Sequence, residues 1–343
     1  MNIHKNVLDI FQLLFRNQFG VNFKYYIELK PEASKRRIFR LSSNNSVCIG
    51  IYNKDIKENL AFVKFSEAFK KNGFNVPEIF GLYKNQKYYL EEDLGDLSLF
   101  KFSMNKDTNK KDILKYYEKA LKDLVEIQTE APKFIDFTYC FQTEWFGIDQ
   151  IITDQKRFYE NFVKQFIEEK VNVELMYSCF NALLEKLNNR DFYFVFRDFQ
   201  PRNIKIKDGK LYYIDYQAGR KGPLQYDVAS FLYSGSLIDL TDEERNKLLK
   251  LYLKEIKQKT GIKSTDFLKT FYYYCVIRLF QTLGSYGMLH KERRARNPLK
   301  KIPVAFENLK KINSEIKLKP INNFIEHLTS IEIPEVQRLQ SEN

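Results

Sequence analysis

The first ninety residues alternate short apolar runs with polar turns, a pattern typical of β-strands in a small sheet. Between the third and fourth runs, apolar side chains recur at helical spacing from Leu60 to Phe69, and Gly73 follows where a left-handed helix end is expected. The pattern predicts a five-stranded antiparallel sheet with one inserted helix. The expected strands are residues 25–29, 37–41, 47–51, 76–80 and 87–91. A leading helix places these apolar side chains on one face: Val7, Ile10, Phe11, Leu14 and Phe15.

After Asp93 the apolar spacing becomes mostly helical. Thr241 and Glu244 form a capping box at the start of one helix, which we expect to run to about Lys259. The other expected helices cover residues 110–128, 154–169, 174–187 and 266–289. Three strand-like runs interrupt them at residues 192–196, 204–206 and 211–214, and a turn at residues 208–209 joins the last two runs as a hairpin. The tail after Lys317 contains prolines and is expected to run over the surface.

These elements predict an α+β chain of two unequal parts. Residues 1–93 form a small lobe with an antiparallel sheet, and residues 94–343 form a larger, mainly helical lobe. The 343 residues are 44% hydrophobic and 15% aromatic, enough to bury a core in both parts.

The charge balance raises the question of a polyanionic partner. The chain has 56 Lys and Arg against 44 Asp and Glu, a formal net charge of +12. Because the excess is largely Lys scattered among Asn, Ile and Tyr, we interpret it as surface composition. We therefore do not expect a nucleic acid partner.

Several other classes of protein are excluded by the sequence pattern. Asp9 and Gln12 interrupt the first apolar stretch, so it does not match a signal peptide. Arg278 breaks the most apolar helical segment, so we expect no membrane span and no membrane partner. The four cysteines are far apart in the sequence and the three histidines are near none of them, which predicts neither a zinc site nor a disulfide framework. We expect a cytoplasmic protein.

The sharpest chemical signal lies in the middle of the chain. Asp198 follows Phe196 and Arg197, Asn203 lies five residues after Asp198, and Asp215 follows the hairpin a further twelve residues on. A loop and a hairpin would return the chain and bring the three side chains to one point. This set suits phosphoryl transfer, because one carboxylate can accept the proton of an attacking hydroxyl while an amide and a second carboxylate hold magnesium against nucleotide phosphates.

On these residues the sequence resembles the aminoglycoside phosphotransferase superfamily of small-molecule kinases, which share a bilobal protein-kinase-like fold. The resemblance extends over residues 35–309 and is strongest over residues 196–233. It implies ATP and Mg²⁺ as cofactors, Asp198 as the catalytic base, and Asn203 and Asp215 as magnesium ligands.

The same resemblance assigns two further features. Glu91 to Asp93 would form the hinge between the lobes, whose backbone pairs with adenine, so Glu91 and Asp93 are expected near the nucleotide. Asp227 matches the buried carboxylate that braces the catalytic loop, although an ordinary acidic residue at a helix start is the alternative.

The sequence departs from the family pattern at three places. Phe196 stands where the family usually has His, and Arg197 stands where antibiotic kinases usually have Gly. The third strand, residues 47–52, has no Lys at the position that grips the phosphates in related kinases.

A basic segment at residues 34–40 could supply the missing cation. Arg37 and Arg40 fall on opposite faces of a strand, so only one of them can face the nucleotide, and we favour Arg40. Glu58, at the start of the inserted helix, could pair with that cation, although a solvated helix charge is the more common role.

Part of the sequence is similar to one branch of the superfamily, the cell-wall amino-sugar kinases that phosphorylate the anomeric hydroxyl of N-acetylmuramate and N-acetylglucosamine. The similar segments are residues 215–227, 283–287 and 302–305, together with Arg278. The resemblance implies an amino sugar as the small-molecule acceptor.

The residue chemistry suggests how such an acceptor would be held. Gln217 can donate to and accept from a sugar hydroxyl, while Arg220 and Arg278 can meet a carboxylate or phosphate. Arg202 adds positive charge beside the catalytic loop, and a buried helix salt bridge is the alternative for Arg278. Asp154 could also reach the acceptor, but we favour helix capping for it.

Two rival functions remain open. An aminoglycoside or choline-type kinase would need an acidic acceptor pocket, whereas the region after the catalytic loop supplies Arg202, Arg220 and Lys221. A non-catalytic pseudokinase that binds nucleotide or RNA would use basic runs such as residues 291–296, and it would not require Asp198, Asn203 and Asp215 together.

Overall fold

The computed structural model describes residues 3–30, 36–187, 191–234 and 240–341, and this part of the chain packs as two compact units. Unit 1 contains residues 1–116, 130–144 and 201–220, and unit 2 contains residues 117–129, 145–200 and 221–343. The expected small lobe, residues 1–93, lies wholly within unit 1, which also takes in segments from later in the chain. The first two residues of the basic segment expected at 34–40 lie outside the described residues.

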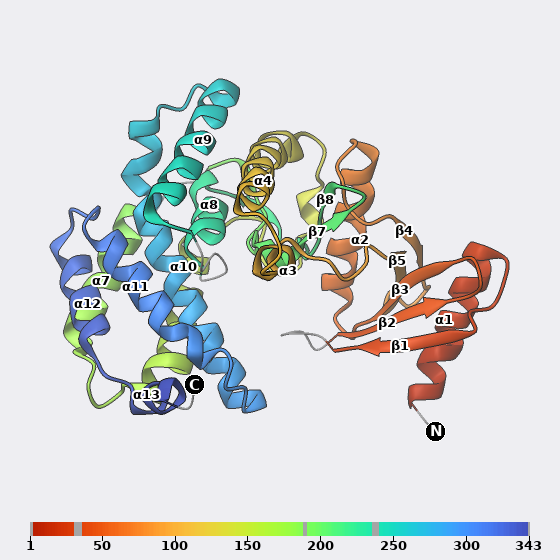
Figure 1. Ribbon diagram of the computed structural model, residues 1–343, viewed down its shortest axis with the longest axis horizontal. Coiled ribbons are helices and arrows are strands. Elements are labelled where there is room, and N and C mark those ends of the chain that lie inside the picture. The colour runs from red at the N-terminus through yellow and green to blue at the C-terminus, as the bar shows by residue number, and fades with distance from the viewer. Residues whose placement is uncertain (1–2, 31–35, 188–190, 235–239, 342–343) are drawn as a thin grey trace. The chain divides into compact units, whose positions relative to one another are not determined.

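Unit 1 is built on a five-stranded antiparallel sheet with the strand order β1-β2-β3-β5-β4 (Figure 1). Its strands are β1 (Tyr25–Leu29), β2 (Arg37–Ser42), β3 (Val47–Tyr52), β4 (Ile79–Leu82) and β5 (Tyr88–Glu92). The expected sheet is confirmed. The fourth strand begins three residues later than predicted, after Pro77, which has no N–H to donate to a ladder.

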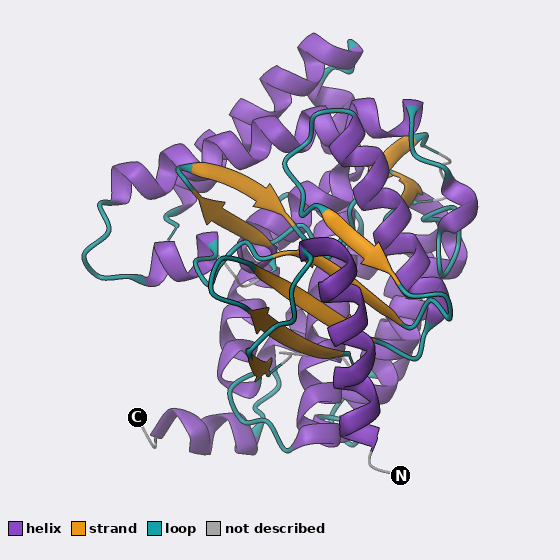
Figure 2. Cartoon of the chain, turned by 90° about the vertical axis from the view of Figure 1, so that its right-hand side faces the viewer, coloured by secondary structure: helices purple, strands orange, loops and turns teal. Residues whose placement is uncertain are grey.

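The helix α1 (Ile3–Phe19) lies along one face of this sheet (Figure 2). Gly50 in β3 permits the close approach, since a Cβ atom there would come within 3.0 Å of Leu41 and of Phe11 in α1. The predicted helical face forms the core of this contact with side chains from three strands. The buried residues of the cluster are Val7, Phe11, Leu14, Phe15, Phe39, Leu41, Cys48, Tyr88 and Leu90.

The inserted helix, α2 (Ile56–Lys71), packs against strand side chains that point to the other face of the sheet. Asp55 caps its first turn, and Gly73 follows its end with a left-handed φ of 80°. Phe62 of α2 stacks on Tyr89, whose neighbours in β5 face α1 instead. This second face of the sheet carries the polar residues considered below.

A hairpin from the middle of the chain completes unit 1. The strands β7 (Ile204–Lys207) and β8 (Lys210–Tyr213) pair in the predicted register, and Asp208 and Gly209 both have positive φ, as a two-residue hairpin turn requires. The hairpin is tied to the chain that follows β5, because Ile206 N–H donates to the Leu97 carbonyl at 2.9 Å. The short helix α3 (Leu99–Met104) follows this segment.

Unit 2 is mainly helical, so the expected combination of an antiparallel sheet part with a larger helical part is confirmed. The helix α10 (Ser264–Arg293) packs against α5, α8 and α11. The other elements of this unit are α5 (Ile148–Phe158), α6 (Lys164–Phe166), α7 (Val173–Lys186), α8 (Leu224–Tyr233), α9 (Asp242–Thr260), α11 (Ile302–Asn313), α12 (Lys319–Ser330), α13 (Pro334–Ser341) and β6 (Tyr193–Val195), together with most of α4 (Lys110–Glu130) and most of β9 (Arg220–Gly222), which pairs with β6.

Two predictions for unit 2 need correction. The helix expected from residue 154 begins six residues earlier, at Ile148, and continues through a π-helical turn (Tyr159–Val163) into α6. The proline-containing tail, for which no helix was predicted, forms α12 and α13, because Pro320 and Pro334 lie in their first turns, where a missing N–H costs nothing. Among the described residues, none of the helices is both long and apolar enough to cross a membrane.

Candidate functional site

In unit 1 the hairpin brings two of the predicted site residues together. Asn203 ends a short 3₁₀ turn before β7, and Asp215 follows β8. Ile214 N–H donates to the Asn203 carbonyl at 3.0 Å, which closes the base of the hairpin. The Asn203 Nδ2 atom then lies 3.3 Å from Asp215 Oδ2. The spacing of the motif therefore produces a convergent amide and carboxylate.

The backbone at Asp215 is held in an uncommon conformation. Its φ of 69° lies in the left-handed region, which non-glycine residues occupy only where their surroundings enforce it. The next residue supplies that enforcement, because Tyr216 is fully buried, stacks on Phe62 at 5.0 Å and shares a 2.6 Å hydrogen bond with Ser66. Packing of Tyr216 on α2 thus fixes the position of the Asp215 carboxylate.

An arginine that precedes β2 completes this polar group, which we call the hairpin cluster: Arg36, Glu58, Asn203, Asp215 and Gln217. Arg36 Nη2 donates to Asp215 Oδ1 at 2.9 Å, and Arg36 Nε lies 3.9 Å from Glu58 Oε1. Gln217 Nε2 lies 2.9 Å from Asp215 Oδ1 and 3.4 Å from Glu58 Oε1. Burial disfavours the charged guanidinium, but Asp215, Tyr89 and Glu58 outweigh that effect and raise the pKa of Arg36 above its ordinary value.

Arg40, the cation favoured from the sequence, has different partners. Its guanidinium pairs with Asp93 at 2.6 Å and with Asp96 at 2.9 Å. Glu58, for which a solvated role was the more common alternative, lies beside Arg36 rather than Arg40. The alternation of side chains along β2 contained the missed signal. Residue 36 falls on the same face as Arg40 and lies one residue beyond the pair of Arg37 with Tyr52, next to the segment that leads into α2.

The predicted hinge, Glu91 to Asp93, leads out of β5. Glu91 lies opposite Ile49 of β3, and its Oε2 atom is buried with no hydrogen-bond partner in the described part of the chain. Burial raises the pKa of Glu91 to about 8. Lys207 of the hairpin donates to the Glu92 carboxylate at 2.7 Å and to the Asp93 carbonyl at 3.2 Å. The hairpin that carries the magnesium candidates is thus anchored to the hinge segment.

In unit 2 a buried carboxylate holds the chain that leads to Asp198. Asp227, in the first turn of α8, accepts hydrogen bonds from the backbone N–H groups of Phe196 at 2.6 Å and of Arg197 at 2.8 Å. Asp227 is fully buried, and this burial raises its pKa to about 7 although the two backbone N–H groups act in the opposite direction. Asp227 therefore fixes the two residues that directly precede Asp198.

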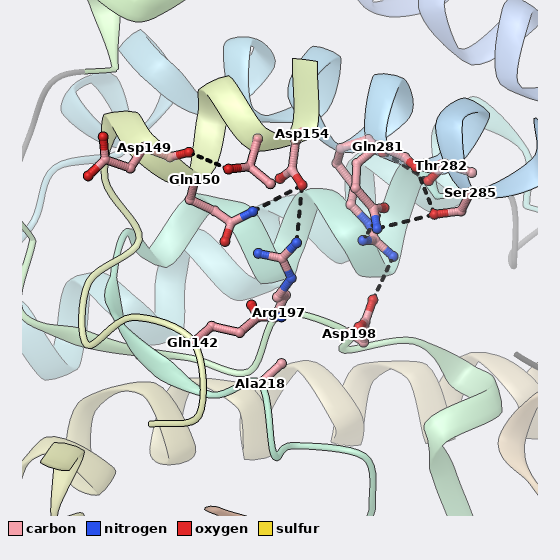
Figure 3. Close-up of polar contacts among 12 residues, drawn as sticks. Gln142, Asp149, Gln150, Asp154, Arg197, Asp198, Ala218, Gln281, Thr282 and Ser285 are labelled. Carbon is pink, nitrogen blue, oxygen red and sulfur yellow. Dashed lines mark hydrogen bonds and ion pairs between the residues drawn. The ribbon is translucent and has the colours of Figure 1, made fainter. Parts of the chain in front are cut away.

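Arg197 combines a strained backbone with a buried ion pair. Its φ of 79° is favourable for glycine and costly for a residue with a Cβ atom. Its guanidinium reaches Asp154 of α5 at 3.1 Å, and Gln150 donates to the same carboxylate oxygen at 3.0 Å (Figure 3). The capping role predicted for Asp154 is wrong, because Asp154 lies inside α5, where Gly147 is the N-cap residue.

Arg278, for which a substrate contact and a buried salt bridge were the alternatives, forms a salt bridge with Asp198, and its contact with a substrate stays a prediction. Its Nη2 atom is 3.1 Å from Asp198 Oδ1, and its Nη1 atom donates to Gln281 at 2.6 Å. The Arg278 side chain is 3% exposed, whereas that of Asp198 is 33% exposed. We call Asp154, Arg197, Asp198, Asp227 and Arg278 the loop cluster. It presents one accessible carboxylate on an otherwise buried support.

The remaining predicted substrate residues lie in unit 1. Arg220 is 1% exposed, and its guanidinium donates to the Ala218 carbonyl at 3.0 Å, to Thr143 at 2.9 Å and to Gln142. These contacts give Arg220 a structural role, and its contact with a substrate stays a prediction. Arg202 is half-buried in the turn before Asn203.

The sequence and the fold were compared with those of known proteins. No protein-family model matches the sequence, and no curated protein is significantly similar to it. Solved structures do match. A candidate aminoglycoside phosphotransferase from Ralstonia eutropha JMP134 has a TM-score of 0.63 and 12% identity over 96% of this chain and 98% of its own.

Two kinases match to a similar degree. An amicoumacin kinase has a TM-score of 0.61 and 14% identity over 96% of this chain and all of its own. An ethanolamine kinase from Plasmodium vivax has a TM-score of 0.60 and 11% identity over 85% of this chain and 84% of its own. At these identities the likeness concerns the fold. The chain therefore has the protein-kinase-like fold found in aminoglycoside phosphotransferase-like and ethanolamine kinase-like small-molecule kinases.

Proposed function

We propose that this protein is an ATP- and magnesium-dependent phosphotransferase that phosphorylates a hydroxyl group of a small molecule. The observation that carries the proposal is the convergence of Asn203 and Asp215 at the base of one hairpin, in a chain with the fold of small-molecule kinases. The amicoumacin kinase of that fold was solved with AMP-PNP and Ca²⁺, which supports the use of a nucleotide with a divalent cation.

The donor set of the hairpin cluster fits magnesium. Asn203 offers an amide oxygen and Asp215 offers a carboxylate. In nucleotide sites Mg²⁺ commonly binds one or two protein carboxylates together with phosphate oxygens and water. Throughout the described ranges, no group of three or more His, Cys, Asp or Glu side chains could form an all-protein metal cage. The residues therefore suit a metal that binds together with the nucleotide.

Each residue has a defined role in the proposed reaction. Asp198 orients the acceptor hydroxyl and accepts its proton, while Asp227 holds the backbone before it and Arg278 orients its carboxylate. Asn203 and Asp215 hold the magnesium ion, which when bound offsets charge on the nucleotide phosphates. The backbone of Glu91 to Asp93 pairs with adenine.

For the acceptor we propose an amino sugar such as N-acetylmuramate or N-acetylglucosamine. Support comes from the similarity of residues 215–227, 283–287 and 302–305 to the amino-sugar kinases. Gln217 also keeps one buried Oε1 atom with no hydrogen-bond partner among the described residues, while its amide nitrogen is held by Asp215. A sugar hydroxyl is a donor that such an oxygen could accept from.

A cationic acceptor is the second candidate. The solved structures of the same fold include a candidate aminoglycoside phosphotransferase and an ethanolamine kinase. In the loop cluster, the Asp154 Oδ2 atom is buried and has no hydrogen-bond partner within the described ranges. A carboxylate oxygen of this kind would favour an ammonium group.

One assay separates the candidates. The purified protein is incubated with ATP and Mg²⁺ and with N-acetylmuramate, N-acetylglucosamine, aminoglycosides, choline or ethanolamine, and ADP release is measured. We expect release with the two amino sugars and none with the methyl glycoside of N-acetylglucosamine, which lacks a free anomeric hydroxyl. Asp198→Ala should lose at least about 100-fold in turnover, whereas Asp242→Ala, at an exposed site in α9, should retain it.

The other outcomes also decide the question. Release only with aminoglycosides, choline or ethanolamine would replace the amino-sugar proposal by the cationic one. Nucleotide binding without release for any acceptor, in wild type and Asp198→Ala alike, would identify a non-catalytic pseudokinase. Absence of nucleotide binding would refute the proposed function altogether.

A further inference from the structure

We infer that Arg36 is the cation that binds the nucleotide phosphates in this protein, in place of the lysine that its third strand lacks. The inference rests on the proposed function and deepens it, because it assigns a phosphate contact to a residue outside the expected strand. It also separates Arg36 from Arg40, which the sequence favours for this role.

The position of Arg36 between two carboxylates from different elements carries the inference. Kinases that transfer phosphate commonly hold a cation against a carboxylate of the helix in the smaller lobe, close to the metal-binding carboxylate. Here Arg36 bonds to Asp215 at 2.9 Å and lies 3.9 Å from Glu58, which is in the first turn of α2. Asn53 and Gln217 also donate to Glu58, at 2.7 and 3.4 Å, so its carboxylate is held in place.

The sheet register shows why this arginine can replace a lysine on β3. Ile38 of β2 pairs with Ile51 of β3, so their side chains point to the same face of the sheet. Arg36 directly precedes β2 and lies two residues before Ile38, so its side chain points to that face as well. Tyr89 pairs with Ile51 across β5 and its hydroxyl interacts with Arg36. A long side chain from β3 at position 51 would enter the same space that Arg36 reaches from β2.

The charge of the hairpin cluster also requires this cation. Glu58 and Asp215 together carry two negative charges, and Arg36 reduces their sum to one. A magnesium ion held by Asp215 and Asn203 would then make the group positive by one charge, which favours a polyphosphate. Without Arg36 the same group would be neutral and would lose an attraction to the nucleotide.

The other arginines of β2 are engaged elsewhere. Arg37 points to the opposite face and forms a two-bond pair with Glu28 at 2.7 and 2.9 Å. Arg40 forms two bonds with each of Asp93 and Asp96. Arg37 is therefore the matched control for a test of Arg36, and Arg40, which contacts the hinge residue Asp93, is the competing candidate.

Direct binding measurements test the inference without relying on turnover. Titration calorimetry gives the affinities of wild type and of Arg36→Met for AMP-PNP with Mg²⁺, and for adenosine, which has no phosphate. A charged hydrogen bond is commonly worth a factor of about 10 to 100 in affinity. We expect a loss of that size for AMP-PNP and a change of less than about threefold for adenosine. Arg37→Met, on the opposite face of the sheet, should bind AMP-PNP like wild type, and Arg40→Met, which tests the competing candidate, should lose less affinity than Arg36→Met.

Two further variants distinguish the loss of the cation from a change in the folded structure. Arg36→Lys keeps the charge but loses the planar fork, so its affinity for AMP-PNP should fall between those of wild type and Arg36→Met. In Arg36→Met/Ile51→Lys the cation is moved to β3, and we expect it to recover at least about threefold of the lost affinity. Circular dichroism melting curves check that each variant is folded.

The outcomes distinguish this inference from the proposed function. Wild-type affinity in folded Arg36→Met, or an equal loss for adenosine and AMP-PNP, would show that Arg36 does not bind the phosphates while the kinase assignment stands. A loss in Arg40→Met but not in Arg36→Met would assign the role to Arg40. If wild-type protein does not bind AMP-PNP at all, both the inference and the proposed function are wrong.

Discussion

The hairpin cluster of unit 1 and the loop cluster of unit 2 hold similar residue types in different surroundings. In the hairpin cluster the side chains of Arg36, Glu58 and Asp215 are 14%, 21% and 32% exposed. In the loop cluster Arg197 and Asp154 are 8% and 1% exposed, and Asp198 is the accessible member. Most members of the first cluster are partly exposed, whereas the second is a buried support for one carboxylate.

The difference in burial predicts which cluster contributes to stability and which to ligand binding. An ion pair that is partly exposed is worth little to stability, because water and salt screen it. Removing one member of a buried pair leaves an uncompensated charge in the interior, which is costly. We therefore expect substitutions in the loop cluster to lower the free energy of unfolding and substitutions in the hairpin cluster to lower ligand affinity.

The largest expected effect on stability is that of Arg197→Ala. The variant leaves the Asp154 carboxylate, which is 1% exposed, with Gln150 as its remaining donor among the contacts described. We expect the free energy of unfolding to fall by about 3–5 kcal/mol. Urea denaturation followed by circular dichroism measures it.

A double variant and a variant of unit 1 serve as controls for this result. Asp154→Asn/Arg197→Gly removes both charges and places glycine at a φ of 79°, so it should recover most of the loss. Arg36→Met, which removes an arginine from the hairpin cluster, should cost less than about 1 kcal/mol. Equal losses for Arg36→Met and Arg197→Ala would contradict the comparison.

Asp227→Ala should have the next largest effect. It removes the acceptor of two backbone N–H groups, those of Phe196 and Arg197, and leaves both donors buried. We expect a loss of about 2–4 kcal/mol in the free energy of unfolding. Because the backbone before Asp198 is no longer fixed, turnover should also decrease. An unchanged unfolding midpoint in urea would contradict this role for Asp227.

The ionisation of Asp227 predicts a dependence of stability on pH. Burial raises the pKa of Asp227 to about 7 from its ordinary value of 3.8, so between these values the folded protein binds a proton that the unfolded chain releases. Stability from this group is therefore fully present below about pH 4 and decreases as the pH rises towards 7. The decrease should be at least about 1.4 kcal/mol, the value of one pKa unit.

The difference between wild type and Asp227→Asn isolates this contribution. The amide does not titrate, so the variant should lack the decrease between pH 4 and 7 even if its stability is lower at every pH. Urea unfolding at intervals across that range provides the measurement. Parallel curves for the two proteins would show that Asp227 is ionised throughout the range.

The smallest expected effect is that of Arg40→Ala on stability. Arg40 bridges Asp93 and Asp96 at a partly exposed edge of β2, so the free energy of unfolding should fall by less than about 1 kcal/mol. Raising the salt concentration should reduce the difference further. Thermal melting at low and high salt tests both points, and a loss that grows with salt would show that packing rather than charge dominates.

Much of the local structure was predictable because its causes lie within a few residues. Thr241 and Glu244 form the expected capping box at the start of α9, and Asp208 and Gly209 form the expected hairpin turn. The hairpin also explains why the spacing from Asn203 to Asp215 could be recognised as a convergent pair. In each case neighbouring residues alone satisfy the hydrogen bonds or set the backbone angles.

The predictions were wrong or incomplete where contacts with segments far away in the sequence determine the local structure. Asp154 matches a capping residue in type, but its partner, Arg197, is 43 residues away in the sequence. The helices α12 and α13 begin at prolines that also occur in irregular segments. Local sequence does not distinguish these alternatives, because packing against the rest of unit 2 selects between them.

The sequence by itself determined the sheet with its inserted helix and the mainly helical part that follows, and it singled out the residues that we propose for phosphoryl transfer. Apolar periodicity and turn residues act over short ranges and can be read along the chain. Only the tertiary structure decided which arginine meets which carboxylate: Arg36 with Asp215, Arg197 with Asp154 and Arg278 with Asp198. Arginine side chains are long and flexible, so their partners are set by the packing of strands and helices that lie far apart in the sequence.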